Sequence, residues 1–310
     1  MHLTPSQLAA ISYRGGHLQL LACAGSGKTE VVARRVADLL DPRHPDALSP
    51  ANIVAFTFTE RAAAELKARI AHRVRETRGG VCGLAEMFVG TTHAFCRRVL
   101  QEEVPEYLRY EGLDEVRQLM LVLREPDASG FADARTADGA TLAAPDDVRR
   151  YLGALDVLRQ AEIDHGRPGD LPLAVPLDRY RDLLRRASLH DFTAQLELCL
   201  DVLRRNVDAG ERLAARVRHV VVDEYQDTNE LQEQVVRALA DFGATLTVVG
   251  DDDQTIFQWN GADVQNILGF ADRYPGAHTI RLEENFRSSA PIVTFAEISS
   301  PTSPAAWRRR

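Results

Sequence analysis

Lysine is almost absent from this chain of 310 residues. It occurs only at Lys28 and Lys67, so 35 of the 37 lysine and arginine residues are arginine. A GC-rich genome would account for that preference, so the preference carries no functional information. It does make Lys28 notable, because this lysine follows two glycines in the stretch LLACAGSGKTE, where a phosphate-contacting lysine would be placed.

Long apolar runs, an export signal and paired cysteines are also lacking. No run approaches the ~18 apolar residues that a membrane span needs. The N-terminal residues 1–16 have no basic start followed by an apolar core, which excludes a secretion signal. The four cysteines (Cys23, Cys82, Cys96 and Cys199) do not show the spacing of a zinc site or a disulfide framework. We therefore expect a cytoplasmic protein with reduced thiols and no membrane contact.

An excess of basic residues is missing as well. The formal net charge is −8, which argues against a protein that binds nucleic acid through a generally basic surface, but leaves room for local basic patches. Apolar residues make up 45% of the chain, which predicts a packed core. The length is sufficient for about two domains.

Apolar segments alternate with helical patterns over much of the chain. Strands are predicted at 17–22 and 52–58, a strand followed by a turn at 220–227, and a strand that ends in acidic residues at 245–254. A helix is predicted at 27–40. Thr59 is expected to cap the helix after the second strand, and Asp227 with Glu230 to cap the helix after the third. This rhythm predicts an α/β fold, with helices on both faces of a parallel sheet. Residues 95–189 interrupt it and are predicted to be a mainly helical insertion.

The stretch at residues 22–29 has the composition of a phosphate-binding loop. Gly25 and Gly27 let the backbone turn tightly so that successive N–H groups face phosphate oxygens, and a helix start follows. Lys28 is placed to reach the outer phosphates of a nucleotide, and the hydroxyl of Thr29 to hold Mg²⁺. The alternative is a glycine-rich turn without a ligand. The usual pattern begins with glycine, where this chain has Ala22.

Three further clusters follow predicted strands, at the sheet edge where open parallel sheets bind ligands. At Asp223 and Glu224 one carboxylate can join a Mg²⁺ shell and the other can accept a proton from an attacking water, although a solvated turn or helix cap is an alternative. Gln254 can orient a water or sense a γ-phosphate. Trp259 lies among polar residues, which favours base stacking over a core position. Arg287 can stabilise charge on a transferring phosphate, although a surface salt bridge is its default role.

In this order the motifs resemble those of superfamily 1 DNA helicases of the UvrD, Rep and PcrA type, over nearly the whole chain. The resemblance implies a RecA-like P-loop NTPase fold that uses ATP and Mg²⁺. In this family the phosphate loop commonly begins with alanine. The implied loop residues are Ala22, Cys23, Ala24, Gly25, Ser26, Gly27, Lys28 and Thr29.

The resemblance also assigns roles outside the loop. Gln7 would read the adenine, and Phe286 would lie against it. Asp223 and Thr29 would hold the metal. The implied catalytic residues are Lys28, Glu224 as base, Gln254 as γ-phosphate sensor and Arg287.

A single-stranded DNA path is implied at the motifs AFTFTE and VGTTHAF and at the tryptophan. Its contacts would come from Thr57, Phe58, Thr91, His93 and Trp259. For His93 alone, a core or surface histidine without a ligand is the alternative. The chain has Asn260 where the family usually has arginine.

The resemblance implies three regions and a motor function. An ATP-binding lobe is expected at 1–94 and 190–279, the helical insertion at 95–189, and the start of a second, missing motor lobe with an irregular tail at 280–310. The expected activity is ATP hydrolysis coupled to 3′-to-5′ movement on single-stranded DNA, with a separate chain as a possible source of the second lobe. The alternatives are a non-catalytic ATP- or DNA-binding module, a truncated and decayed remnant, and a P-loop phosphotransferase.

Overall fold

The structure is a computed structural model, and it describes residues 3–76, 82–135, 139, 142, 144–165, 173–251, 254, 265–289 and 291. The chain folds into two compact units. The first comprises residues 1–95 and 207–310, and the second comprises residues 96–206. This division is by compactness, and the domain limits expected from the sequence, residues 95 and 189 for the insertion, stay a prediction.

Parallel strands form the centre of the first unit. Six strands of the described residues pair in the order β3-β2-β6-β7-β1-β8, and every pairing is parallel. This confirms the predicted fold class. The strands are β1 (Leu18–Ala22), β2 (Ile53–Phe56), β3 (Phe88–Gly90), β6 (His219–Val222), β7 (Thr245–Gly250) and β8 (His278–Leu282). The end of β8, which was predicted to belong to a second lobe, pairs with β1 of this sheet.

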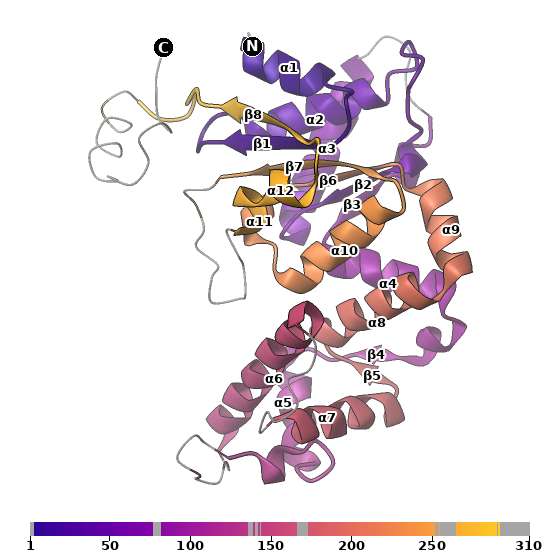
Figure 1. Ribbon diagram of the computed structural model, residues 1–310, viewed down its shortest axis with the longest axis vertical. Coiled ribbons are helices and arrows are strands. Elements are labelled where there is room, and N and C mark those ends of the chain that lie inside the picture. The colour runs from indigo at the N-terminus through magenta and orange to yellow at the C-terminus, as the bar shows by residue number, and fades with distance from the viewer. Residues whose placement is uncertain are drawn as a thin grey trace. The chain divides into compact units, whose positions relative to one another are not determined.

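Helices cover both faces of this sheet (Figure 1). On one face Leu18, Leu20, Ile53 and Ala55 pack in one buried cluster with apolar residues of the helices α2 and α3. On the other face, Gln19 donates to the carbonyl of Ile267 in α11. The helices of this unit are α1 (Pro5–Ser12), α2 (Lys28–Leu39), α3 (Glu60–Glu76), α9 (Val207–Arg216), α10 (Glu230–Asp241), α11 (Gln265–Leu268) and α12 (Phe270–Arg273), with 3₁₀ turns at Pro50–Asn52, Leu84–Glu86 and Tyr225–Asp227.

Two predicted helix caps have different outcomes. The prediction for Thr59 is confirmed, because its hydroxyl accepts a hydrogen bond from the backbone N–H of Ala62 at 3.1 Å. The prediction for Asp227 is wrong: the capping residue of α10 is Asn229, whose side chain accepts from the N–H of Gln232 at 3.0 Å. Asp227 instead ends the 3₁₀ turn that precedes this cap.

The second unit is mainly helical, as predicted for the insertion. The helix α4 (Thr92–Glu103) leads into it, and α5 (Glu115–Arg124), α6 (Pro145–His165), α7 (Ala174–Arg186) and α8 (Phe192–Arg205) follow, with 3₁₀ turns at Pro105–Arg109 and Phe131–Asp133. Two short strands, β4 (Glu111–Gly112) and β5 (Leu189–His190), pair in parallel. Among the described residues, no helix is both long enough and apolar enough to cross a membrane.

Candidate functional site

A tight loop joins β1 to α2 at the carboxyl edge of the sheet. Gly25 and Gly27 have φ values of +76° and +82°, a backbone region that side chains other than glycine rarely adopt. A Cβ at Gly25 would lie 2.5 Å from the side-chain oxygen of Asn285. Gly27 is the N-cap of α2, and the first N–H groups of a helix have no acceptors within the helix. The loop therefore has the backbone of an anion site.

The segment after β8 lies against this loop. The N–H of Phe286 donates to the carbonyl of Gly25 at 2.9 Å, and the N–H of Cys23 donates to the carbonyl of Leu282 at 3.2 Å. The side-chain oxygen of Asn285 accepts from the N–H of Arg287 at 2.9 Å. Phe286 and Arg287, predicted to meet the nucleotide, are thus held beside a loop that precedes them by about 260 residues in the chain.

Gln7 also reaches the loop. Its side-chain amide donates to the carbonyl of Ser26 at 2.9 Å, and its side-chain oxygen accepts from the N–H of Thr4 at 3.0 Å. The hydroxyl of Ser26 is buried and has no hydrogen-bond partner among the described residues. A phosphate oxygen or a water at the loop would be a suitable partner for that hydroxyl.

Acidic residues face Lys28 from the end of β6. The ammonium of Lys28 lies 3.0 Å from a carboxylate oxygen of Glu224. Burial and the neighbouring Glu224 raise the pKa of Asp223 to about 6. Glu224 itself has φ of +52°, a sparsely populated conformation for a residue other than glycine. Such conformations persist where the surroundings enforce them, and they occur often at active sites.

Four of the residues predicted to contact DNA lie after β2 and β3. The hydroxyl of Thr57 donates to the carbonyl of Thr59 at 3.0 Å, and Phe58 follows with 36% of its surface exposed. Thr91 caps α4 by accepting from the N–H of Ala94 at 3.2 Å. Burial lowers the pKa of His93 to about 4, so this imidazole is neutral at pH 7. Because β2 and β3 are parallel neighbours, these side chains share one edge of the sheet. Trp259 lies outside the described residues.

Comparison with known proteins identifies the family. Residues 3–275 match the UvrD/REP helicase N-terminal domain. The chain belongs to the UvrD/REP helicase family. It is 33% identical over 305 residues to the ATP-dependent DNA helicase PcrA of Bacillus subtilis (strain 168), and 33% identical over 302 residues to DNA helicase II of Escherichia coli (strain K12).

Each of these matches covers 95% of the chain, and the chain spans only 39% of the length of either relative. Among solved structures it is similar to the Pif1 helicase from Candida albicans, with 12% identity, a TM-score of 0.39, and coverage of 91% of this chain and 40% of that one. Because this TM-score is low, the description of the fold depends on the strand order given above and not on this likeness.

Sequence reasoning missed one link in this UvrD/REP helicase domain. The side-chain amide of Gln226 donates to Glu224 at 2.8 Å, and its oxygen accepts from the N–H of Asp251 at 3.1 Å. The side chain of Asp251 in turn accepts from Gln254 at 2.7 Å. A series of hydrogen bonds therefore connects Glu224 with Gln254. The only sequence signal for Gln226 is its place two residues after Glu224.

Proposed function

We propose that this chain binds Mg·ATP at residues 22–29 and single-stranded DNA beside the ends of β2 and β3. As part of a helicase motor it would couple ATP hydrolysis to 3′-to-5′ movement. The observation that supports this most is the ion pair of Lys28 with Glu224 beside a glycine loop whose conformation suits phosphate. The relatives' names, which describe ATP-dependent DNA helicases, support the same proposal.

The ammonium of Lys28 would exchange its pairing with Glu224 for the outer phosphates of ATP. Glu224 would then accept a proton from the attacking water, with Gln254 orienting that water. Gln7 and Phe286 are proposed to hold the adenine, and Arg287 the γ-phosphate. Gln7 and Phe286 belong to segments far apart in the chain, and both bond to the backbone of the glycine loop. This placement supports the proposed roles, because positioning contributes most of the catalysis in phosphoryl transfer.

Thr29 and Asp223 are proposed to hold Mg²⁺. A hydroxyl and a carboxylate are hard oxygen ligands, and Mg²⁺ usually takes one or two carboxylates together with waters and phosphate oxygens. The donor set therefore fits, although among the described residues no group of three or more His, Cys, Asp or Glu side chains is arranged as a metal site. When bound, the ion neutralises charge that develops on the phosphates.

A substitution at Lys28 tests the nucleotide site. Lys28→Ala should weaken the binding of fluorescent ATP with Mg²⁺ about 100-fold or more, because an ion pair with the phosphates is lost. Lys67→Ala is the matched control, since Lys67 is exposed on α3. Equilibrium titration measures binding, and circular dichroism checks that both variants are folded. Unchanged binding in Lys28→Ala would mean that the loop is only a turn.

The DNA path is tested with labelled oligo-dT. Stacking on an aromatic ring contributes about 1–3 kcal/mol per base, so Phe58→Ala and Trp259→Ala should each weaken binding about five-fold or more. Phe192→Ala, an exposed phenylalanine of the second unit, should have no effect. Hydrolysis of ATP that rises with oligo-dT supports a motor, and binding without turnover supports a non-catalytic module. If the wild-type chain binds neither ligand, the proposal is wrong.

A further inference from the structure

The proposed base Glu224 has a backbone conformation that its surroundings must enforce. Its φ is +52°, in a region that residues with side chains rarely adopt. Hydrogen bonds from Lys28 at 3.0 Å and from Gln226 at 2.8 Å hold its carboxylate. Contacts of a side chain do not by themselves fix the backbone, which continues directly into the 3₁₀ turn Tyr225–Asp227. The packing of this turn therefore contributes to the position of the base.

Tyr225 anchors the turn. The residue is fully buried, and its ring packs edge-on against Phe270 of α12 with the ring centroids 5.7 Å apart. Its hydroxyl donates a hydrogen bond to a carboxylate oxygen of Glu233 in α10. A buried hydroxyl without an acceptor is costly, so this bond restricts where the ring of Tyr225 can lie.

Glu233 is the centre of a buried network. The residue has no exposed surface, and its second carboxylate oxygen accepts from the hydroxyl of Tyr274 at 2.9 Å and from Arg273 at 3.0 Å. Arg273 also donates to the side-chain oxygen of Asn266 at 3.2 Å. The side-chain amide of Asn266 in turn donates to the carbonyl of Thr228 at 2.8 Å. The network therefore holds the chain after the base at two points.

We propose that Glu233 is a positioning residue for Glu224 and acts on it through Tyr225. The inference rests on the proposed function, because it concerns the residue that would accept a proton from the attacking water. By holding Tyr225, Glu233 keeps the backbone of Glu224 in its left-handed conformation and the carboxylate beside Lys28. Phosphoryl transfer depends mainly on positioning, so a displaced base would slow hydrolysis without weakening the binding of ATP.

A purely structural role for the network is the alternative. Buried carboxylates also pair with arginine where they only join helices, as Asp191 does with Arg159 in the second unit. Such a role predicts a loss of stability alone. The rate of hydrolysis at saturating ATP would then stay unchanged in the folded protein.

The test separates kcat for ATP hydrolysis from the Kd for fluorescent ATP, both measured on the full chain with oligo-dT. Glu233→Ala should lower kcat about ten-fold or more and leave Kd within about two-fold. Glu233→Gln keeps an acceptor for the hydroxyl of Tyr225, so its kcat should return to within about three-fold of wild type. Tyr225→Phe removes only that hydroxyl and should lower kcat about five-fold, which keeps the test valid if Glu233→Ala does not fold.

Tyr180→Phe in the second unit is the control for Tyr225→Phe. Tyr180 is fully buried, and its hydroxyl donates to the buried carboxylate of Asp191 at 2.9 Å, so a bond of the same kind is lost. Urea unfolding should show a loss of stability. The value of kcat should stay within about two-fold of wild type, because this bond shares no partner with the turn after Glu224.

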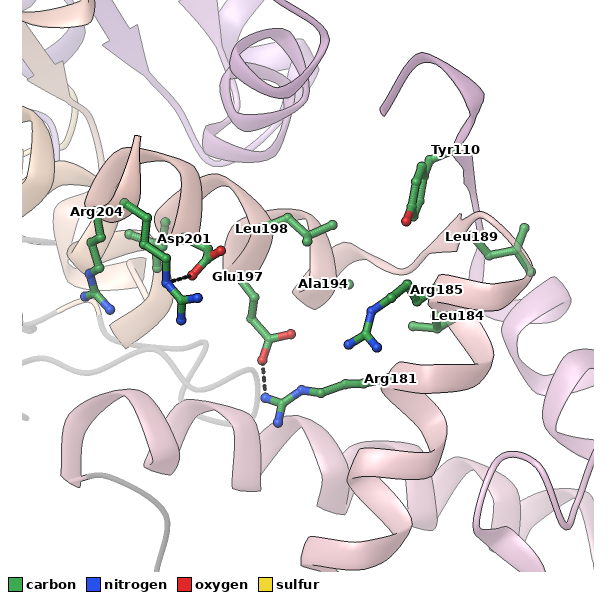
Figure 2. Close-up of a pocket in the computed structure, with 12 residues that line it drawn as sticks. Tyr110, Arg181, Leu184, Arg185, Leu189, Ala194, Glu197, Leu198, Asp201 and Arg204 are labelled. Carbon is green, nitrogen blue, oxygen red and sulfur yellow. Dashed lines mark hydrogen bonds and ion pairs between the residues drawn. The ribbon is translucent and has the colours of Figure 1, made fainter. Parts of the chain in front are cut away.

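Glu197→Ala is the control for Glu233→Ala. Glu197 lines a pocket of the second unit, where its carboxylate pairs with Arg181 at 2.6 Å (Figure 2). It also pairs with Arg159 at 2.7 Å, so each of the two glutamates serves more than one donor. Glu197→Ala should lower stability and leave kcat within about two-fold of wild type.

A second readout needs no turnover. The chain has only two lysines, so methylation of its amines with isotope-labelled formaldehyde, which keeps their charge, gives few NMR signals. Lys28→Ala and Lys67→Ala assign them. In Glu233→Ala and in Tyr225→Phe the signal of Lys28 should move towards its position in Glu224→Gln, because the ion pair is loosened, while the signal of Lys67 stays in place. Neither control in the second unit should move the signal of Lys28.

Three results would overturn the inference. The first is a wild-type kcat in both Glu233→Ala and Tyr225→Phe. The second is an equal loss of kcat in the two controls, and the third is an unmoved signal of Lys28. A wild-type chain that does not hydrolyse ATP would instead refute the proposed hydrolysis, and the signal of Lys28 would still decide whether Glu233 holds Glu224 in place.

Discussion

Among the residues that the structure describes, each unit has one fully buried arginine, Arg35 or Arg159, and the two units satisfy its charge in opposite ways. In the sheet unit Arg35 bonds to neutral acceptors: the carbonyls of Ala10 and Tyr13 at 2.9 and 2.7 Å, and the hydroxyl of Thr247 at 2.9 Å. In the helical unit Arg159 bonds to carboxylates, with Asp191 at 2.9 Å and Glu197 at 2.7 Å.

The electrostatic consequences are opposite. Burial, together with the nearby Arg14, lowers the pKa of Arg35 to about 10. Burial opposes ionisation of Arg159 too, but the carboxylates of Asp191 and Glu197 outweigh it and raise the pKa of this guanidinium. The same pairing holds the pKa of Asp191 below its usual value despite burial.

The difference follows from what surrounds each arginine. Arg35 lies on α2 next to the end of α1, where backbone carbonyls lack partners in the helix. In the described part of the second unit the only paired strands are the two-residue strands β4 and β5. Ion pairs of the buried Arg159 in α6 instead reach Asp191 and Glu197 at the start and in the middle of α8. Removing each arginine should therefore leave different groups behind.

The largest effect is expected in the helical unit. Arg159→Met leaves the buried Asp191 without its cationic partner, whereas Glu197 keeps its salt bridge to Arg181. Breaking a buried ion pair in this way costs about 3–5 kcal/mol of unfolding free energy. Arg35→Met leaves neutral acceptors, so its cost should be smaller, about 1–3 kcal/mol. Urea unfolding followed by circular dichroism measures both.

Arg149→Met is the control for Arg159, because the Arg149 side chain is exposed and should contribute less than about 0.5 kcal/mol. Adding Asp191→Asn to Arg159→Met should recover part of the loss, since the stranded buried charge is removed. If Arg35→Met proves more costly than Arg159→Met, the contrast between the units is wrong.

A smaller change in unfolding free energy is expected in the sheet unit when the pH is lowered. Burial, and then the charge of Arg35, lower the pKa of His219 to about 3 from an ordinary 6.5. The native state therefore binds fewer protons than the unfolded state between these values, so stability is full above about pH 6.5 and falls as the pH drops towards 3. When the pH is lowered from 7 to 4.5, His219 should reduce the unfolding free energy by on the order of 2–3 kcal/mol.

His219→Gln should remove that part of the pH dependence, because glutamine can still bond to the hydroxyls of Thr245 and Thr247 but does not titrate. Urea unfolding of both proteins at pH 7 and 4.5 measures the difference. His72→Gln, an exposed histidine of α3, is the control. Equal pH dependence in wild type and His219→Gln would contradict the assignment.

The sequence was sufficient for the parts of the site that topology places together. Gly25, Lys28 and Asp223 each follow a strand, and parallel strands end at one edge, so the strand pattern alone predicted their meeting. The roles of Phe286 at the adenine and of Arg287 at the γ-phosphate came from the family resemblance, and the position of both residues beside the loop depends on β8 pairing with β1.

Other features needed coordinates. The limits of the two compact units depend on packing between segments that are far apart in the chain. The sequence pattern near residues 95 and 189 contains no information about that packing. The buried Arg35 did have a signal: it stands four residues from both Val31 and Leu39 on the apolar side of α2. The role of Arg159 had none, because its partners Asp191 and Glu197 lie far away in the chain.

Helix caps extend the contrast between neutral and charged groups, with the smallest expected effect. In the sheet unit the cap of α10 is the neutral Asn229, and the side-chain oxygen of Gln232 accepts a hydrogen bond from the backbone N–H of Asn229 at 3.1 Å. In the helical unit the cap of α8 is Asp191, which accepts from the N–H of Ala194 at 2.6 Å and also holds Arg159. Asn229→Ala should cost only about 1 kcal/mol in urea unfolding, the usual value for a lost cap.

Asp227→Ala distinguishes this cap from the one that the sequence suggested. Burial and the nearby Glu224 raise the pKa of Asp227 to about 6, and one of its carboxylate oxygens is buried with no hydrogen-bond partner among the described residues. At pH 7 this carboxylate is mostly ionised, and the raised pKa means that its charge is less favourable in the native state than in the unfolded state. Removing it should therefore cost less than Asn229→Ala or even stabilise the protein. The opposite order of the two variants would restore Asp227 as the capping residue of α10.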